Sequence, residues 1–197
     1  MRADARKNRD HLLAVAGTAI AEQGVEVSLR DIARRADVGL ATLLRHFPTR
    51  EALLEALLRT SFEELAARAA ELETSHSSGD ALVSWLRDCV EWTTEYRGAT
   101  VLMAAAIEDT ESALHASCVT LRAAGARLLA RAQAEGVARS DIDGADLFGL
   151  VAMLAWLGDQ PALASRADRL FGVVAGAILT GAGCGDAGEE RRSRAGG

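Results

Sequence analysis

The segment SLRDIARRADVGLATLLRHFPTREAL, residues 28–53, constrains the fold of this chain more than any other stretch. Ser28 and Asp31 have the spacing of a helix N-terminal capping pair, and apolar residues recur at helical intervals after them. The triplet Asp37-Val38-Gly39 interrupts the pattern, because Asp and Gly tolerate turn geometry, and Pro48-Thr49 interrupts it again. The segment therefore predicts two short helices joined by a tight turn, followed by the start of a third helix.

A further amphipathic helix is expected upstream, over residues 9–23, with Gly24 at its C-terminal cap. Its apolar face is formed by Leu12, Val15, Ala16, Ala19 and Ile20. Three helices within about fifty residues, with a tight turn between the second and third, are typical of a helix-turn-helix unit. In that unit one helix braces the next, which enters the major groove of DNA.

The charge distribution agrees with this division of the chain. Residues 1–50 contain nine Lys/Arg and six Asp/Glu, whereas the whole chain has a formal net charge of −6. A basic N-terminal part followed by an acidic remainder is typical of a protein that presents one end to phosphates. Ordinary scatter of charge gives the same excess, so the helix spacing is the stronger evidence.

The segment resembles the helix-turn-helix of the tetracycline-repressor (TetR) family. The positions that match the family pattern are Ile32, Ala33, Ala36, Val38, Thr42, Leu43, His46, Phe47, Arg50, Glu51, Ala52 and Leu53. Three residues depart from the pattern. Asp37 and Gly39 stand where Gly and Ser are usual, and Leu44 replaces a Tyr that typically bonds a phosphate.

The resemblance implies that Thr42, His46 and Arg50 contact backbone phosphates and that Arg30 reaches a base or a phosphate. Leu44 and Ala41 suit the methyl group of thymine. Arg45 is open to two interpretations, a base reader or a phosphate contact. The complete predicted DNA-binding set is Arg30, Leu40, Ala41, Thr42, Leu44, Arg45, His46 and Arg50.

The rest of the chain predicts an all-α fold, because it has only two Pro and no alternating strand pattern. We expect a helix-turn-helix DNA-binding domain over residues 1–50, a helical effector-binding and dimerisation domain over 51–183 and a disordered tail over 184–197. Helices of the second domain are expected at residues 50–72, 80–97, 99–107, 110–135, 143–158 and 161–182.

Two uncharged stretches, residues 147–157 and 170–182, predict a homodimer. A helix that is apolar on all sides needs cover on all sides, so we expect these two helices from each subunit to form a four-helix interface. A monomeric core that buries both helices is the alternative. The predicted interface residues are Leu147, Leu150, Val151, Leu154, Leu170, Val173, Val174 and Ala177.

Large side chains gather on one face of the predicted helix 80–97. Trp85, Cys89, Trp92 and Tyr96 fall within a narrow arc, which suits either a wall for a flat, apolar small molecule or an ordinary core. Both interpretations remain open. Residues expected to complete such a ligand site are Met103, Glu108, Arg122, Met153 and Trp156.

No catalytic or cofactor motif supports an enzyme, a cofactor or a metal site, and the three Cys residues are isolated. No signal peptide or membrane span is evident, so we expect a cytoplasmic protein. The sequence as a whole predicts a ligand-responsive transcriptional repressor. It would bind an inverted-repeat operator in double-stranded DNA as a homodimer and be released by an unknown small-molecule effector. The alternatives are an effector-independent DNA-binding regulator and a small-molecule binding module.

Overall fold

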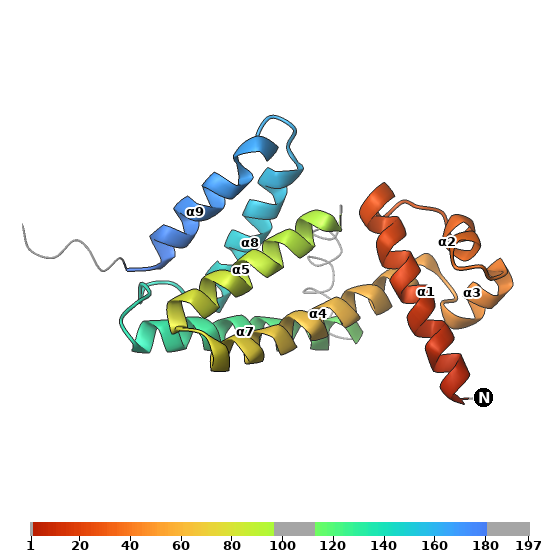
Figure 1. Cartoon of the computed structure of the whole chain (residues 1–197), viewed down its shortest axis with the longest axis horizontal. Helices are drawn as coiled ribbons and strands as arrows, with labels where there is room; N and C mark the ends of the chain where they lie inside the picture. Colours follow the sequence, from red (N-terminus) through yellow and green to blue (C-terminus); the bar gives the residue numbers. More distant parts are fainter. Residues whose placement is uncertain (1, 97–112, 181–197) are drawn as a thin grey trace, which may run out of the picture.

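The computed structural model describes residues 2–96 and 113–180, and its regular elements within these ranges are all helices (Figure 1). The all-α prediction is therefore confirmed. The elements in chain order are α1 (Arg2–Gln23), α2 (Leu29–Arg35), α3 (Leu40–His46), α4 (Arg50–Ser75), α5 (Ser78–Glu95), α7 (Ala113–Ala134), α8 (Gly144–Asp159), the 3-10 turn η1 (Ala164–Arg166) and α9 (Ala167–Ile178).

The buried side chains form two separate cores. The head core lies among α1, α2, α3 and the first part of α4, whereas the body core lies among the rest of α4, α5, α7, α8 and α9. Figure 1 shows the head and the body as two lobes, with α4 running from one into the other. Each lobe has its own hydrophobic centre, which is the usual mark of a domain.

The helix α4 connects the lobes without a break. Thr49 caps its start by accepting a hydrogen bond from the Ala52 amide at 3.1 Å. The 26 residues of α4 span about 39 Å at 1.5 Å per residue. Leu53 and Leu57 are buried in the head core, and Phe62 is fully buried in the body core. Because the same rigid helix contributes to both cores, it fixes the orientation of the head on the body.

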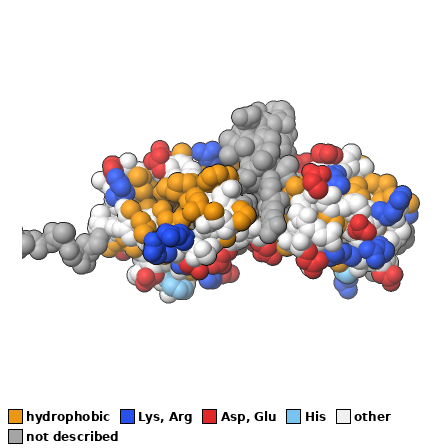
Figure 2. Space-filling view, turned by 90° about the horizontal axis from the view of Figure 1, so that it is seen from above, with side chains coloured by type: hydrophobic (Ala, Val, Ile, Leu, Met, Phe, Trp, Pro, Cys, Tyr) orange, Lys and Arg blue, Asp and Glu red, His pale blue; other side chains and the backbone are white. Residues whose placement is uncertain are grey.

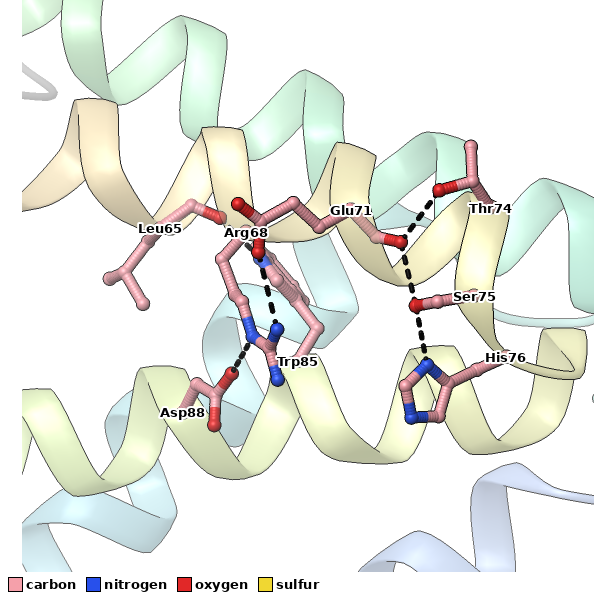
Figure 3. A network of polar contacts seen from close by, with 8 residues as sticks. All are labelled: Leu65, Arg68, Glu71, Thr74, Ser75, His76, Trp85 and Asp88. Atoms are coloured by element: carbon pink, nitrogen blue, oxygen red, sulfur yellow. Dashed lines mark hydrogen bonds and ion pairs between the residues drawn. The ribbon is translucent and has the colours of Figure 1, made fainter.

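Polar contacts hold α5 against the outer side of α4 (Figure 3). The guanidinium of Arg68 lies 3.2 Å from a Glu71 oxygen and 3.3 Å from Asp88 on α5. The indole N–H of Trp85 donates to the Leu65 carbonyl at 3.0 Å, so this buried donor is satisfied. The Trp85 ring itself lies over Gly125 of α7, where a side chain would have no room.

The last two helices form an outer layer in which α8 packs on α5 and α9 packs on α8. The prediction of one helix over residues 161–182 is wrong in its bounds, because α9 begins at Ala167 and ends at Ile178. After Ile178 the backbone pairs with the turn that follows α7. The Thr180 amide donates to the Val137 carbonyl at 3.0 Å, and the Ile178 carbonyl accepts from Arg139 at 2.9 Å. These hydrogen bonds take the place of those that a longer α9 would form within the helix.

Two predicted segments lie outside the described residues, the helix at 99–107 and the tail at 184–197. The helices expected at 50–72, 80–97, 110–135 and 143–158 correspond to α4, α5, α7 and α8, with ends that differ by a few residues. No helix among residues 2–96 and 113–180 has the length and hydropathy needed to cross a membrane.

The close approach of α5 and α7 gives a first prediction. An added Cβ at Gly125 would lie 2.4 Å from the Trp85 ring, which is fully buried. We expect Gly125→Ala to lower the free energy of unfolding by about 1–3 kcal/mol through overpacking, although Ala is the better helix former by about 1 kcal/mol. Denaturant unfolding at fixed protein concentration measures the change.

The control for this prediction is Ala123→Gly, at an exposed position two residues away on the same helix. This substitution changes helix propensity alone and should lower the free energy of unfolding by about 1 kcal/mol. A Gly125→Ala protein that is more stable than the parent would show that the Trp85 contact does not limit the packing of α5 on α7.

Candidate nucleic-acid interface and effector region

The turn between α2 and α3 has the geometry that its sequence predicts. Ser28 caps α2 by accepting from the Asp31 amide at 3.1 Å. Asp37 has φ of 54°, the left-handed conformation that Asp and Asn tolerate better than most side chains. The Val38 amide donates to the Ala33 carbonyl at 3.0 Å, and Gly39 is the N-cap of α3. These contacts fix the angle at which α3 leaves α2.

One face of α3 is anchored in the head core and the other faces outward. Leu43 is fully buried, and Phe47, at the C-cap, is 2 % exposed. Ala41, Leu44 and Arg45 are exposed on the outer side. The Arg45 guanidinium makes long contacts of 3.5 Å with the Thr42 hydroxyl and with the Ala41 carbonyl. The outer face of α3 thus presents one cation, one hydroxyl and small or aliphatic groups.

Two of the predicted phosphate contacts, at the C-terminal end of α3 and at the start of α4, are tied to neighbouring elements. His46 is half-buried, and its Nε2 lies 3.4 Å from the side-chain amide of Asn8 on α1. Arg50 donates to the Val25 carbonyl at 2.6 Å. A guanidinium has five N–H donors, so this bond positions Arg50 and leaves other donors for a ligand. Both predicted phosphate contacts therefore also have structural partners within the head.

A groove of about 450 Å³ lies beside the turn, between α2 and the start of α3. Its lining includes the predicted residues Arg30 and Leu40, together with Arg34. Arg30 and Arg34 are exposed, and Arg34 forms an ion pair with Asp31 at 3.2 Å. The eight predicted DNA-binding residues therefore lie together on α2, α3 and the start of α4.

The predicted ligand-binding residues that the structure describes do not all lie together. Trp85 and Cys89 are buried in the body core, and burial raises the pKa of the Cys89 thiol well above its usual range. Arg122 lies over the Phe148 ring at 5.8 Å. Met153 and Trp156 are 42 % and 58 % exposed on the outer side of α8. Met103 and Glu108 lie outside the described residues.

Trp92 and Tyr96 occupy a different position, near the head. The Trp92 ring packs edge-on against Phe62, with centroids 5.5 Å apart, and lies 5.0 Å from the Tyr96 ring. Tyr96 contacts both the body core and the head core, and its hydroxyl approaches Gly17 of α1. Burial, with Glu95 and Glu64 nearby, raises the pKa of Tyr96. The end of α5 therefore touches the DNA-binding head directly.

The predicted interface residues divide into two groups. Leu147, Val151 and Leu154 are at most 6 % exposed because they are part of the body core of the protomer, so a partner subunit cannot reach them. This corrects the prediction for these three residues. The others lie at or near the outer surface, namely Leu150, Leu170, Val173, Val174 and Ala177.

The outer surface of α8 and α9 is apolar. Figure 2 shows hydrophobic side chains gathered over the body on the face where these helices lie. Val173 is 65 % exposed, and nothing lies within 4 Å of a Cβ placed at Gly172 or Gly176. We name this surface the outer stripe and define it by the exposed residues Gly149, Ala152, Met153, Trp156, Gly172, Val173, Gly176 and Ala177.

The sequence did not indicate a groove of about 410 Å³ between α5, η1, α8 and α9. Arg87, Glu91 and Glu95 line it from α5 at intervals of four residues. This spacing indicates a charged face of α5. Such a face usually meets only solvent. Nothing in the sequence indicates that α9 lies across the groove from it. Among the described residues, no cluster of three or more His, Cys, Asp or Glu could hold a metal ion.

Comparisons with known proteins agree with the geometry of the head and the body. Residues 12–57 match the family described as bacterial regulatory proteins, tetR family. Residues 77–177 match the C-terminal domain described as transcriptional regulator SbtR-like. No curated protein matches the chain.

Several solved structures superpose on most of the chain. The TetR transcriptional regulator SCO0520 from Streptomyces coelicolor is 33% identical, with 88% of this chain and 99% of that chain covered and a TM-score of 0.68. A TetR transcription regulatory protein from Mycobacterium vanbaalenii is 30% identical, with 90% and 98% covered and a TM-score of 0.67. Reduced NemR from E. coli shares the fold at 16% identity, with 87% and 97% covered and a TM-score of 0.65.

The left-handed turn residue gives a second prediction. At φ of 54° a β-branched side chain is strained, and we expect Asp37→Val to lower the free energy of unfolding by about 1–2 kcal/mol. Asp37→Gly should leave the stability within about 1 kcal/mol of the parent, because Gly adopts this conformation without strain. Thermal unfolding of both variants measures the difference. Equal stability of the Val and Gly variants would contradict the turn geometry.

Proposed function

Because the chain belongs to the TetR family of bacterial transcriptional regulators, we propose that it represses transcription as a ligand-responsive homodimer. Two heads bind the half-sites of an inverted-repeat operator, and a small molecule bound in the body releases them. The main support for the proposal is the way in which α3 is anchored on one face and exposed on the other. Its inner face is fixed by the buried Leu43, whereas its outer face leaves Ala41, Leu44 and Arg45 free to meet base edges.

The residues around α3 fall into two groups, one suited to contact phosphates and one suited to contact bases. Thr42, His46 and Arg50 lie toward the ends and flanks of the outer face, where phosphate contacts position a recognition helix. Arg30 approaches the duplex from the bracing helix. Leu44 offers an aliphatic contact to a thymine methyl. For Arg45 two partners remain open, a base edge or a backbone phosphate.

Dimerisation through the outer stripe would place two heads on one duplex. Met153, Trp156 and Val173 expose large apolar surfaces, and the small residues between them let a second pair of helices approach closely. A two-fold arrangement of α8 and α9 buries this surface in a four-helix interface. The half-sites would then lie about 34–36 Å apart, or a multiple of that distance.

The connection between the lobes supports control by a ligand. The continuous helix α4 enters both cores, and Tyr96 at the end of α5 packs against α1. A ligand that shifts α5 relative to α4 therefore changes contacts of the head. It releases DNA only to the extent that it binds the DNA-incompetent conformer more tightly.

Nuclease protection tests the proposed function. The purified full chain is incubated at moderate salt with DNA from upstream of its own and neighbouring genes. We expect protection of an inverted repeat, loss of that protection in cell extract that contains the effector, and a reporter gene that is silent until the effector is present. Absence of any protected repeat would contradict the proposal, and protection that no metabolite relieves would favour the effector-independent regulator.

Arg45 gives the third prediction. If the Arg45 guanidinium reads a base, Arg45→Ala should weaken binding to the operator by about 1–3 kcal/mol per contact. The specificity should also be relaxed at one position of each half-site. If the guanidinium contacts a phosphate, the affinity should fall on all duplexes alike, and the slope of log K against log salt should fall by about 1 per contact. Fluorescence anisotropy at several salt concentrations separates the two.

The control is Arg127→Ala, which removes an exposed Arg from the body and so makes the same change in net charge. It should leave the operator affinity and the salt slope nearly unchanged. An equal effect of the two substitutions would show that Arg45 acts only through the overall charge.

The outer stripe gives the fourth prediction. Val173→Arg places a charge at the centre of the proposed interface and should raise the dimer dissociation constant at least about tenfold, because a buried unpaired charge is costly. Sedimentation equilibrium measures the constant. Val119→Arg is the matched control, since Val119 is 49 % exposed on α7, away from the stripe. A Val173→Arg protein that dimerises like the control would contradict the proposed interface.

A further inference from the structure

The groove between α5, η1, α8 and α9 has an apolar floor and a charged rim. Val90, Leu154 and Phe171 contribute the floor, and Leu154 and Phe171 are part of the body core. The groove has a volume of about 410 Å³. This lies within the range that small-molecule sites occupy in proteins, about 300–1,000 Å³. The groove therefore has room for a compact organic ligand with an apolar body.

Among the described residues that line the groove, the one cation, Arg87, is already neutralised. Arg87 lies 3.5 Å from the Asp168 carboxylate and 4.2 Å above the centre of the Phe171 ring. The ion pair and the cation–π contact occupy the guanidinium on two sides. An anionic ligand would have to compete with Asp168 for this group.

The remaining carboxylates at the rim are unpaired. Within residues 2–96 and 113–180, Glu91 and Glu95 take part in no ion pair. Both lie in the last part of α5, which has no basic residue in its final turn. The partial negative charge at a helix C-terminus adds to theirs. The described residues of the rim therefore carry an excess of negative charge beside an apolar floor.

From this combination we propose that the groove binds organic cations with an apolar body, such as quaternary ammonium or phosphonium compounds. The apolar part of the ligand covers Val90, Leu154 and Phe171, and its positive centre lies between Glu91 and Glu95. The carboxylates provide selectivity by charge, and the floor provides the burial of apolar surface that favours binding.

The position of the groove links such a ligand to the DNA-binding head. Glu95 is followed directly by Tyr96, whose hydroxyl approaches Gly17 of α1. A ligand that draws the end of α5 toward α9 shifts this contact. The identification of the ligand as the effector rests on the proposed function, whereas its binding to the groove does not.

The binding test uses two ions of nearly the same shape and opposite charge, tetraphenylphosphonium and tetraphenylborate, with the full-length chain. Isothermal titration calorimetry should give saturable binding of the phosphonium and at least about tenfold weaker binding of the borate. The double substitution Glu91→Gln with Glu95→Gln should weaken phosphonium binding about tenfold, which corresponds to about 1.4 kcal/mol.

The matched control is the double substitution Glu26→Gln with Glu63→Gln, which removes two exposed carboxylates that do not line the groove. It should leave phosphonium binding unchanged. The inference is overturned if the phosphonium does not bind, if both ions bind equally, or if the two double variants lose affinity to the same extent.

A DNA assay separates this inference from the proposed function. If phosphonium binds selectively and displaces the wild-type chain from its operator, both are supported. A chain that binds its operator but not the phosphonium overturns only the cation site. If the chain binds the phosphonium but no duplex, the cation site is supported and the proposed function is overturned.

Discussion

Leu57 and Leu58 are neighbours on α4, yet Leu57 is buried in the head core and Leu58 in the body core. This shared burial couples the two lobes through one helix. Neither lobe can release α4 without exposing part of its hydrophobic centre, and each fully buried Leu contributes about 1.5–3 kcal/mol. The head is therefore held at a fixed angle, and the Tyr96 hydroxyl adds a second contact with α1, at Gly17 beside Leu57.

The head was predictable because its signals are local. The caps at Ser28 and Thr49, the break at Asp37 and the inward Leu43 all act within a few residues of one another in the sequence. Such short-range patterns determine the hydrogen bonds of a turn whatever the rest of the chain does. The resemblance to a known family covers the same local segment.

The body was less predictable because its sites depend on how helices turn relative to one another. The periodicity of α5 identified the stripe from Trp85 to Tyr96, but not that Trp85 closes on Gly125 of α7. The apolar run in α8 likewise did not reveal that Leu147 is buried in the body core whereas Trp156 is exposed. The groove beside Glu91 needed the position of α9, which no local pattern in α5 contains.

The proposed mode of DNA binding requires that α4 hold each head at one angle on a two-fold symmetric dimer. Selection of binding sites from a pool of random duplexes by the purified full chain measures the separation of the two half-sites. We expect inverted repeats whose half-sites keep one constant separation, about one helical turn of DNA or a multiple of it, with one dimer on each repeat. Recovered half-sites at variable separations, or single half-sites bound by one protomer, would contradict this mode of binding.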